Sequence, residues 1–291
     1  MKRLFRGLAL GALLVAPPAT FAQDAEAEVV VEEPAVNSGN ISLTGGVDFA
    51  THYFFRGYLQ EDQDLIAQPY LNVYFNLMEE GDTTLTAYIG TWNSFHGEKT
   101  GADEGSFGAW YEADFVGGVD LGLGGGFTLG AIYTVYAYPN GAFDTIEEVG
   151  LKLSYDDTDK WGLPFALNPF LGVYFETDDQ NGSEDTYLEF GIAPTVYTFD
   201  ENSNQPIAVA VPITIGTSID DYYFDDEGDE EFLGYGSIGL AASMPLGSGN
   251  YGDWTLNASV TWLQLFAEGL ESANNDDDNE IIGKIGVSFS Y

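Results

Sequence analysis

Apolar and polar residues alternate along most of the chain after residue 40. In the segment 64–77, every second residue from Leu65 to Leu77 is apolar or proline, and the residues between them include two tyrosines, two asparagines and a glutamine. No run keeps the apolar spacing of an amphipathic helix. Because successive side chains of a β-strand point to opposite faces, this alternation predicts strands with one apolar and one polar face.

Twelve such runs, rich in aromatic and β-branched residues, are separated by clusters of Gly, Asn and Asp. They cover approximately residues 41–55, 64–77, 83–95, 108–121, 126–138, 145–155, 165–176, 186–199, 206–217, 232–245, 253–266 and 280–291. Their lengths meet the roughly 9–11 residues that a tilted strand needs to cross a bilayer.

The connections between the runs differ in length in a regular way. Several that follow odd-numbered runs are long and acidic, and several that follow even-numbered runs are tight. The long ones are 96–107, 177–185, 218–231 and 267–279, and the tight ones are 78–82, 122–125 and 246–252. Outer-membrane barrels have short turns at one end and longer loops at the other. The pattern therefore predicts an all-β fold, an antiparallel transmembrane β-barrel of twelve strands in meander order, with acidic loops outside.

Two observations keep alternatives open. The same alternation suits a secreted β-sandwich or a soluble barrel, although an exported chain without cysteine and with aromatic ends to its apolar faces favours the membrane. Pro69, Pro194 and Pro212 fall inside predicted strands, where proline removes a ladder N–H group. We expect bulges or shifted boundaries at these prolines, and a strand count that differs by two stays open.

Composition excludes several classes of protein. The formal net charge is −39 over 291 residues, so the chain would repel nucleic acid phosphates. Without cysteine there are no disulfides, thiolate zinc sites, iron–sulfur clusters or cysteine catalysis. His52 and His96 are the two histidines, and no hydrolase elbow, zinc-protease helix or phosphate loop is present. Ser94 lies close to His96, but neighbours on one strand face are not expected to form a dyad. We expect no enzyme and no resident cofactor.

The two ends of the chain predict its location. Residues 1–22 have the basic start, short apolar stretch and small residues before the cleavage point of a signal peptide, with an uncleaved anchor as the alternative. Residues 23–39 are predicted to be an acidic, disordered leader, and residues 40–291 the barrel. The chain stops at Tyr291 within a strand, with Phe289 two residues earlier, which looks like the signal that barrel-insertion machinery reads. We expect the bacterial outer membrane and its lipid; the oligomeric state stays open.

The segment from Phe49 to Gln60, FATHYFFRGYLQ, resembles a motif of the TorF-like family of porins. The matching residues are Tyr53, Phe55, Arg56, Gly57 and Gln60. His52 and Leu59 depart from the family pattern, in which an acidic residue and a small hydroxyl residue are usual. The resemblance covers about a dozen residues and implies a barrel porin with no assigned substrate.

If the apolar faces point to lipid, the opposite faces line the lumen. The predicted lining residues are mostly acidic: Glu112, Asp114, Glu148, Lys152, Glu176, Glu189 and Lys284, with Arg56 fixing the first loop inside the mouth. A lumen with more carboxylates than ammonium groups concentrates cations. The main hypothesis is therefore a porin-like channel with a weak preference for cations. The alternative is a plugged, non-conducting barrel in which these charges pair with one another and with tyrosines.

Acidic loops provide weak candidates for a metal site. Carboxylate oxygens are ligands that Ca²⁺ and Mg²⁺ prefer. The candidates are Asp225, Asp226 and Asp229 in one loop and Asp276 and Asp278 in another. A solvated acidic surface is the simpler interpretation. In the plugged alternative, these loops would serve a structural or adhesive role.

Overall fold

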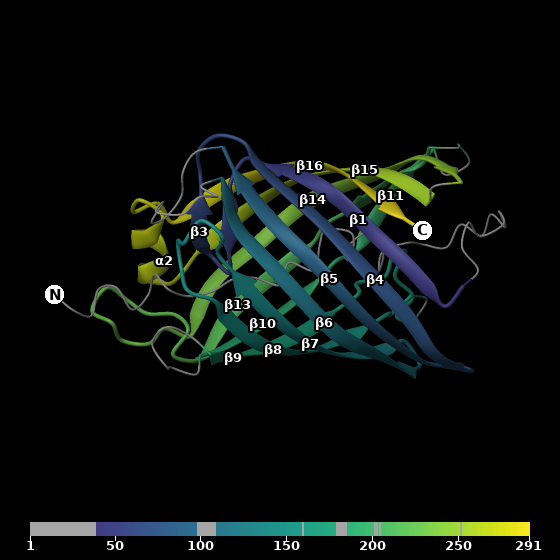
Figure 1. The fold of residues 1–291 in the computed structure, drawn as a ribbon, viewed down its shortest axis with the longest axis horizontal. Coiled ribbons are helices and arrows are strands. Elements are labelled where there is room, and N and C mark those ends of the chain that lie inside the picture. The colour runs from purple at the N-terminus through teal and green to yellow at the C-terminus, as the bar shows by residue number, and fades with distance from the viewer. Residues whose placement is uncertain are drawn as a thin grey trace.

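The computed structural model describes residues 39–97, 109–158, 160–178, 185–200, 203, 205–250 and 252–291. The predicted signal peptide and leader lie outside these ranges. Twelve antiparallel strands form a closed barrel, which confirms the predicted fold class, strand number and meander order (Figure 1). The barrel strands are β1 (Ile41–Ala50), β4 (Ile66–Glu80), β5 (Thr83–His96), β6 (Trp110–Gly124), β7 (Phe127–Ala137), β8 (Ile146–Tyr155), β9 (Phe170–Asp178), β10 (Thr186–Ile192) continued by β11 (Thr195–Phe199), β12 (Ile207–Ala210) continued by β13 (Ile213–Asp220), β14 (Leu233–Gly249), β15 (Gly252–Leu265) and β16 (Asn279–Ser290).

The barrel closes where the first strand meets the last. β1 pairs with β4 on one side and with β16 on the other, and Val47 lies opposite Val287. Leu43 and Tyr291 exchange two backbone hydrogen bonds at the end of this seam. The final residue is thus part of the closing ladder. Within the described ranges, no helix is long and apolar enough to cross a membrane.

The three prolines coincide with irregular places in the ladders. Pro194 separates β10 from β11 and Pro212 separates β12 from β13, so each pair of segments is one interrupted strand. The carbonyl oxygens of both prolines still accept backbone hydrogen bonds, from Val211 and Gly239 respectively. Pro69 lies within the continuous strand β4, between the pairs Ala67–Phe95 and Tyr70–Trp92, and forms no pair with β5. The barrel therefore tolerates a missing N–H group by interrupting the strand at Pro194 and Pro212 and by omitting a pair at Pro69.

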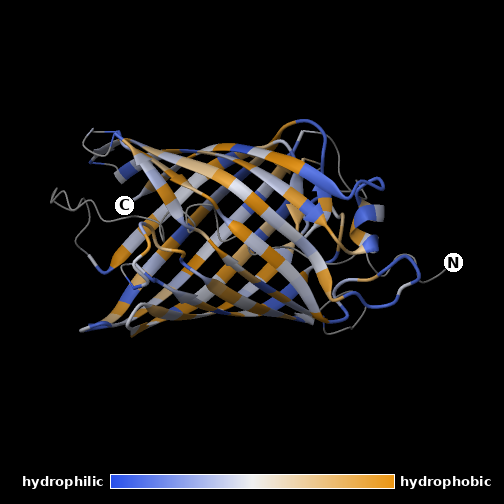
Figure 2. Cartoon of the chain, turned by 180° about the vertical axis from the view of Figure 1, so that it is seen from behind, coloured by the Kyte–Doolittle hydropathy of each residue, from blue (hydrophilic) through white to orange (hydrophobic). Residues whose placement is uncertain are grey.

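The outer face of the barrel is apolar. Large hydrophobic side chains recur at every second position and are about half exposed, as at Leu71, Ile89, Phe115, Leu151, Leu171, Val260 and Ile285. Figure 2 shows the resulting alternation of hydrophobic and hydrophilic positions along the strands. Buried polar residues occupy the intervening positions, including Thr44, Asn72, Glu112, Thr134 and Glu148. A closed sheet with this alternation has an apolar exterior and a polar interior.

The two ends of the barrel differ. Longer connections and the short helix α2 (Glu268–Ala273) gather at one end, and most tight turns lie at the other (Figure 1). The segment 156–169 is a longer connection at the tight-turn end, where the Asp157 carboxylate accepts backbone hydrogen bonds from Leu167 and Asn168.

The first predicted run, 41–55, is wrong in its second half. β1 ends at Ala50, and the following residues form a separate hairpin of β2 (Tyr53–Phe55) and β3 (Tyr58–Glu61). These two strands pair only with each other in the described sheets.

Ile89 tests whether the apolar face meets lipid. It lies in the middle of β5 and is 57% exposed. We expect Ile89→Arg to lower the free energy of unfolding in lipid vesicles by about 2–4 kcal/mol, as charged residues do on the lipid face near the bilayer midplane. Ile89→Val is the control and should cost less than about 0.8 kcal/mol, because a lipid-facing position loses one methylene and leaves no cavity. Equal stability of the two variants in a urea titration would contradict a lipid-facing position.

Candidate functional site

The β2–β3 hairpin is a tight reversal whose tip lies inside the barrel. Its two turn residues, Arg56 and Gly57, have φ of 45° and 90°. The two-residue turn that best fits the twist of antiparallel strands requires a positive φ at both central positions. A β-carbon on Gly57 would also come within 2.6 Å of Leu270 Cδ1, so the end of the Leu270 side chain would have to move. The local sequence thus sets the turn that carries Arg56 inward.

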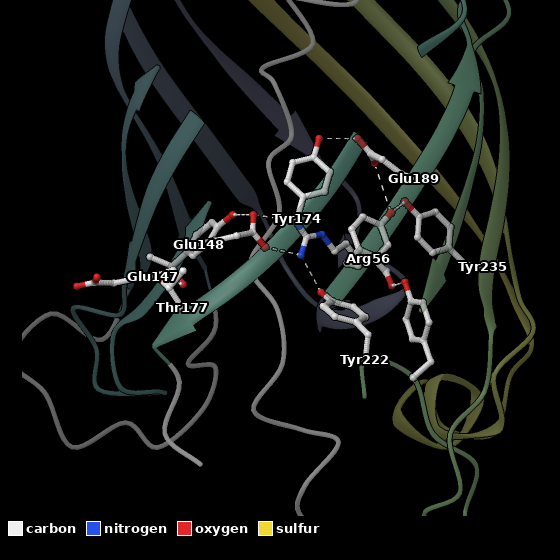
Figure 3. Close-up of polar contacts among 11 residues, drawn as sticks. Arg56, Glu147, Glu148, Tyr174, Thr177, Glu189, Tyr222 and Tyr235 are labelled. Atoms are coloured by element: carbon white, nitrogen blue, oxygen red, sulfur yellow. Dashed lines mark hydrogen bonds and ion pairs between the residues drawn. The ribbon is translucent and has the colours of Figure 1, made fainter. Parts of the chain in front are cut away.

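The Arg56 guanidinium forms a two-pronged ion pair with Glu148 of β8. Nη1 donates to Glu148 Oε2 at 2.7 Å and Nη2 donates to Oε1 at 3.0 Å, and both side chains are 1% exposed (Figure 3). Nη1 also donates to the Tyr222 hydroxyl at 3.1 Å. A planar guanidinium matches a carboxylate in this geometry, which lysine cannot reproduce.

Aromatic rings surround the same guanidinium. Its central carbon lies 4.1 Å from the ring centre of Tyr187 and 4.8 Å from that of Tyr174, with Phe55 and Tyr222 slightly farther away. The negative faces of aromatic rings attract a cation, and the attraction is stronger away from water. Burial is the largest single influence and would lower the pKa of Arg56, but the Glu148 carboxylate, Tyr222 and Tyr136 together raise it more, and the net pKa lies above its ordinary value. Arg56 therefore stays charged.

The loop before β14 packs onto the hairpin. Tyr223 donates its hydroxyl to the carbonyl oxygen of Arg56 at 2.8 Å, and Tyr58 donates to the carbonyl oxygen of Tyr222 at 3.1 Å. The rings of Tyr58 and Tyr223 stack. Burial raises the pKa of Tyr222 well above its ordinary value, so its phenol is neutral. Tyrosines therefore join this loop to the hairpin.

The opposite side of the hairpin contacts β5 and β6. Tyr53 donates to Glu112 Oε2 at 2.8 Å, and Tyr111 donates to the side-chain oxygen of Gln60. Four of the five residues that carry the family resemblance thus contribute directly to the hairpin's turn or contacts, and Phe55, the fifth, is fully buried. In this structure, the residues of the motif form a hairpin that lies inside the barrel.

A polar chain that sequence reasoning missed links the hairpin to β5. Ser94 Oγ lies 2.9 Å from His96 Nε2, and His96 Nδ1 lies 3.4 Å from Glu61 Oε2. Ser94 and His96 were not expected to form a dyad, as neighbours on one strand face, yet their side chains lie within hydrogen-bonding distance. Ser94 is fully buried, and Glu61 belongs to the hairpin. We assign this chain to holding the hairpin, and the absence of enzymatic activity stays a prediction.

The structure brings some predicted lining residues together and keeps others apart. Arg56 and Glu148 are in contact, and Glu189 accepts hydrogen bonds from Tyr174 and Tyr187, two rings of the same cluster (Figure 3). Glu176 of β9 lies directly opposite Glu148, and the remaining predicted lining residues are spread along the inner face. Asp114 follows Glu112 on β6, Lys152 lies 4.9 Å from the Phe170 ring, and Lys284 of β16 interacts electrostatically with Asp48.

Sequence reasoning did not anticipate the aromatic partners of Arg56. Tyr222 and Tyr223 sit between acidic residues in a connection that was expected to be solvated, yet both are fully buried. Three consecutive aromatics, Tyr222 to Phe224, in an acidic loop were the available signal. Hydrophobic rings in such a loop indicate that it folds back onto the protein.

The candidate metal residues do not form a cluster. The loops at 225–229 and 268–278 do touch, since Ser272 donates to Asp226 Oδ1 at 2.7 Å. In the part of the chain that the structure describes, however, no group of three or more His, Cys, Asp or Glu side chains has the arrangement to hold a metal ion. Asp225, Asp229, Asp276 and Asp278 thus lack a shared centre of that kind.

Comparison with solved structures agrees with this architecture. An outer-membrane channel from Pseudomonas putida F1 aligns with a TM-score of 0.50 at 9% identity, covering 90% of this chain and 100% of that chain. The chain has the fold of an outer-membrane β-barrel. The β domain of the Bordetella autotransporter BrkA (TM-score 0.43, 11% identity, 87% and 99% covered) and the NanC porin (0.40, 15%, 86% and 98%) are also similar. No protein-family model and no curated protein matches the chain, so membership of the TorF-like family stays a prediction.

A double-mutant cycle tests the Arg56–Glu148 pair. Removing one partner of a buried ion pair leaves an uncompensated charge, so Glu148→Gln and Arg56→Met should each lower the free energy of unfolding by about 3–5 kcal/mol. The double variant should lose clearly less than the sum, because neither charge is left alone. Unfolding in vesicles provides the measurement, and Lys152→Met on the same strand as Glu148 is the control. Additive losses would contradict a coupled pair.

Proposed function

We propose that this protein is an outer-membrane channel for small cationic or neutral solutes, whose conductance is restricted by the β2–β3 hairpin. The observation that carries the proposal is the placement of this hairpin inside the barrel, held by the Arg56–Glu148 ion pair. A hairpin anchored mainly through side chains can leave its place without breaking the strand ladder of the wall. The wall of the barrel then stays intact while the passage through it becomes wider.

The charges of the inner face support the preference for cations. Glu112, Asp114, Glu148 and Glu176 are all buried on this face. Glu189 accepts hydrogen bonds from Tyr174 and Tyr187, whose rings lie against Arg56. Arg56, Lys152 and Lys284 are the basic residues among the predicted lining positions. An excess of carboxylates in a narrow, low-dielectric passage favours cations over anions.

A permanently closed barrel with a structural role is the second candidate. The observation that favours it is the extent of the tyrosine packing around the hairpin, where Tyr53, Tyr187, Tyr222 and Tyr223 are 0–2% exposed. Such packing would make removal of the hairpin costly. The two candidates therefore differ in whether weakening the hairpin's anchors produces a current.

Conductance in planar bilayers separates the two candidates. We expect the unaltered barrel to show rare or small openings under a salt gradient, with the reversal potential of a cation-preferring path. Arg56→Ala should make openings larger or more frequent, because it removes the ion pair and the cation that the rings surround. Replacing residues 53–61 by a short flexible linker should have the stronger effect.

Two comparisons make the result specific. Lys160→Ala removes an exposed basic residue of the segment 156–169, at the opposite end of the barrel from the hairpin, and should leave the frequency of opening unchanged. Neutralising Glu189 by Glu189→Gln in the linker variant should weaken the cation preference. A folded, inserted linker variant that carries no current would contradict the channel and favour the closed barrel.

A further inference from the structure

Most of the side chains that hold Arg56 belong to the wall of the barrel and not to the hairpin. Glu148 lies in β8, Tyr174 in β9 and Tyr187 in β10. The carboxylate contacts both terminal nitrogens of Arg56, and the two ring centres lie 4.8 and 4.1 Å from its central carbon (Figure 3). These three side chains would remain if the hairpin left its place. The wall therefore contains a guanidinium-binding arrangement of its own.

Hydrogen bonds within the wall orient these side chains without Arg56. Tyr174 and Tyr187 both donate to the Glu189 carboxylate, at 2.9 and 3.3 Å. Tyr136 of β7 donates to Glu148 Oε1 at 3.0 Å. A site whose side chains are already held in place loses less conformational entropy when a ligand binds. The two rings and the Glu148 carboxylate are thus prepared to receive a planar cation.

The arginine that occupies this place does not satisfy all of its own donors. Arg56 is 2% exposed, and its Nε has no hydrogen-bond partner among the described groups. A buried N–H group without an acceptor costs free energy. The side chain is attached to the turn of the hairpin, which fixes the direction from which the guanidinium enters. A free solute can rotate to place its remaining N–H groups, so attachment to the hairpin is what favours Arg56.

We propose that Glu148, Tyr174, Tyr187 and Tyr222 form a binding site for alkylguanidinium solutes, and that Arg56 occupies this guanidinium site as an internal substitute for the solute. The proposal rests on the proposed function in one respect, because a solute reaches the site only when the hairpin leaves it. A guanidinium group matches a carboxylate through two parallel hydrogen bonds, stacks on aromatic rings and is more weakly hydrated than an ammonium group. The site therefore selects guanidinium groups among cations.

Neighbouring carboxylates restrict the rest of the solute. Glu176 lies directly opposite Glu148 in the strand pairing, and Asp114 interacts electrostatically with Glu148. Repulsion between like charges is stronger away from bulk water. A carboxylate on the solute would therefore be repelled. We expect the site to prefer alkylguanidinium solutes whose other end is neutral or carries an amino group.

Chemical rescue of Arg56→Ala tests the site in the full barrel refolded in vesicles. The substitution vacates the site, so ethylguanidinium should raise the thermal midpoint of the variant. It should do so at about tenfold lower concentration than ethylammonium, which cannot form the two parallel hydrogen bonds. Ethylurea has a similar shape without the charge and should have no effect. The unaltered barrel is the control, and its midpoint should not rise because Arg56 fills the site.

Two further variants assign the effect to the site. Glu148→Gln combined with Arg56→Ala should abolish the response to ethylguanidinium, and Tyr187→Leu in the Arg56→Ala barrel should weaken it by about tenfold. The proposal is overturned if ethylurea raises the midpoint as much as ethylguanidinium does, or if the response survives Glu148→Gln. It is also overturned if 4-guanidinobutyrate binds more tightly than 4-guanidinobutylamine.

The variant with a linker in place of residues 53–61 separates this proposal from the channel. It keeps Glu148, Tyr174, Tyr187 and Tyr222, so calorimetry with ethylguanidinium also provides the test if Arg56→Ala does not refold. We expect binding together with a partial block of the current. Binding without any current would contradict the channel and support the site. Current without binding would overturn the guanidinium site and leave the channel in place.

Discussion

Closure of the sheet is the constraint on which the rest of this protein depends. An open sheet edge leaves N–H and C=O groups unpaired, and lipid offers them no hydrogen-bonding partner. β1 must therefore meet β16, and Tyr291 takes part in the seam. Once the sheet is closed, one face of every strand is turned inward. The inner face must then find partners for its own polar groups, which explains why charged and tyrosine side chains are organised there.

Around the hairpin, one cation meets this demand for polar partners. Arg56 reaches the carboxylate of Glu148 and the rings of Tyr174 and Tyr187, so a single guanidinium organises residues from β8, β9 and β10. Arginine suits the place because it is planar, carries several donors and loses less hydration than an ammonium group on burial. The hairpin provides the geometry, since its two turn residues have positive φ and present the side chain inward. The local geometry of the turn thus places Arg56 beside Glu148, a charged residue far along the chain.

The fold could be predicted from the sequence because it depends on local patterns. Alternation and turn residues mark each strand by itself, and the last strand shows this in every second residue from Ile281 to Tyr291. The prolines at 194 and 212 were recognised as irregular, although only the structure shows that each interrupts one strand. The site could be predicted only in part. Inward positions follow from register, but the pairing of Arg56 with Glu148 joins strands whose order in space depends on the whole barrel.

The hairpin misled the strand prediction for the same reason. Tyr53, Phe54 and Phe55 have the composition of a barrel strand, and composition does not say that the chain turns away from the wall after Ala50. Likewise, the buried state of Tyr222 and Tyr223 arises from contacts with residues more than 160 positions earlier, as the hydrogen bonds to Tyr58 and Arg56 show. No sequence window contains such information.

The separation of these contacts along the chain also bears on the order in which the hairpin and the barrel fold. It is part of the first connection, but Arg56 finds Glu148 only 92 residues later and Tyr222 166 residues later. Contacts between such distant residues form after local ones, because closing a long loop costs entropy before any contact repays it. Adjacent strands can pair as soon as both have formed, whereas Arg56 can form its contacts only after β8 and the loop before β14 have formed. Burial of this side chain therefore requires β8 and the loop before β14 to be in place first.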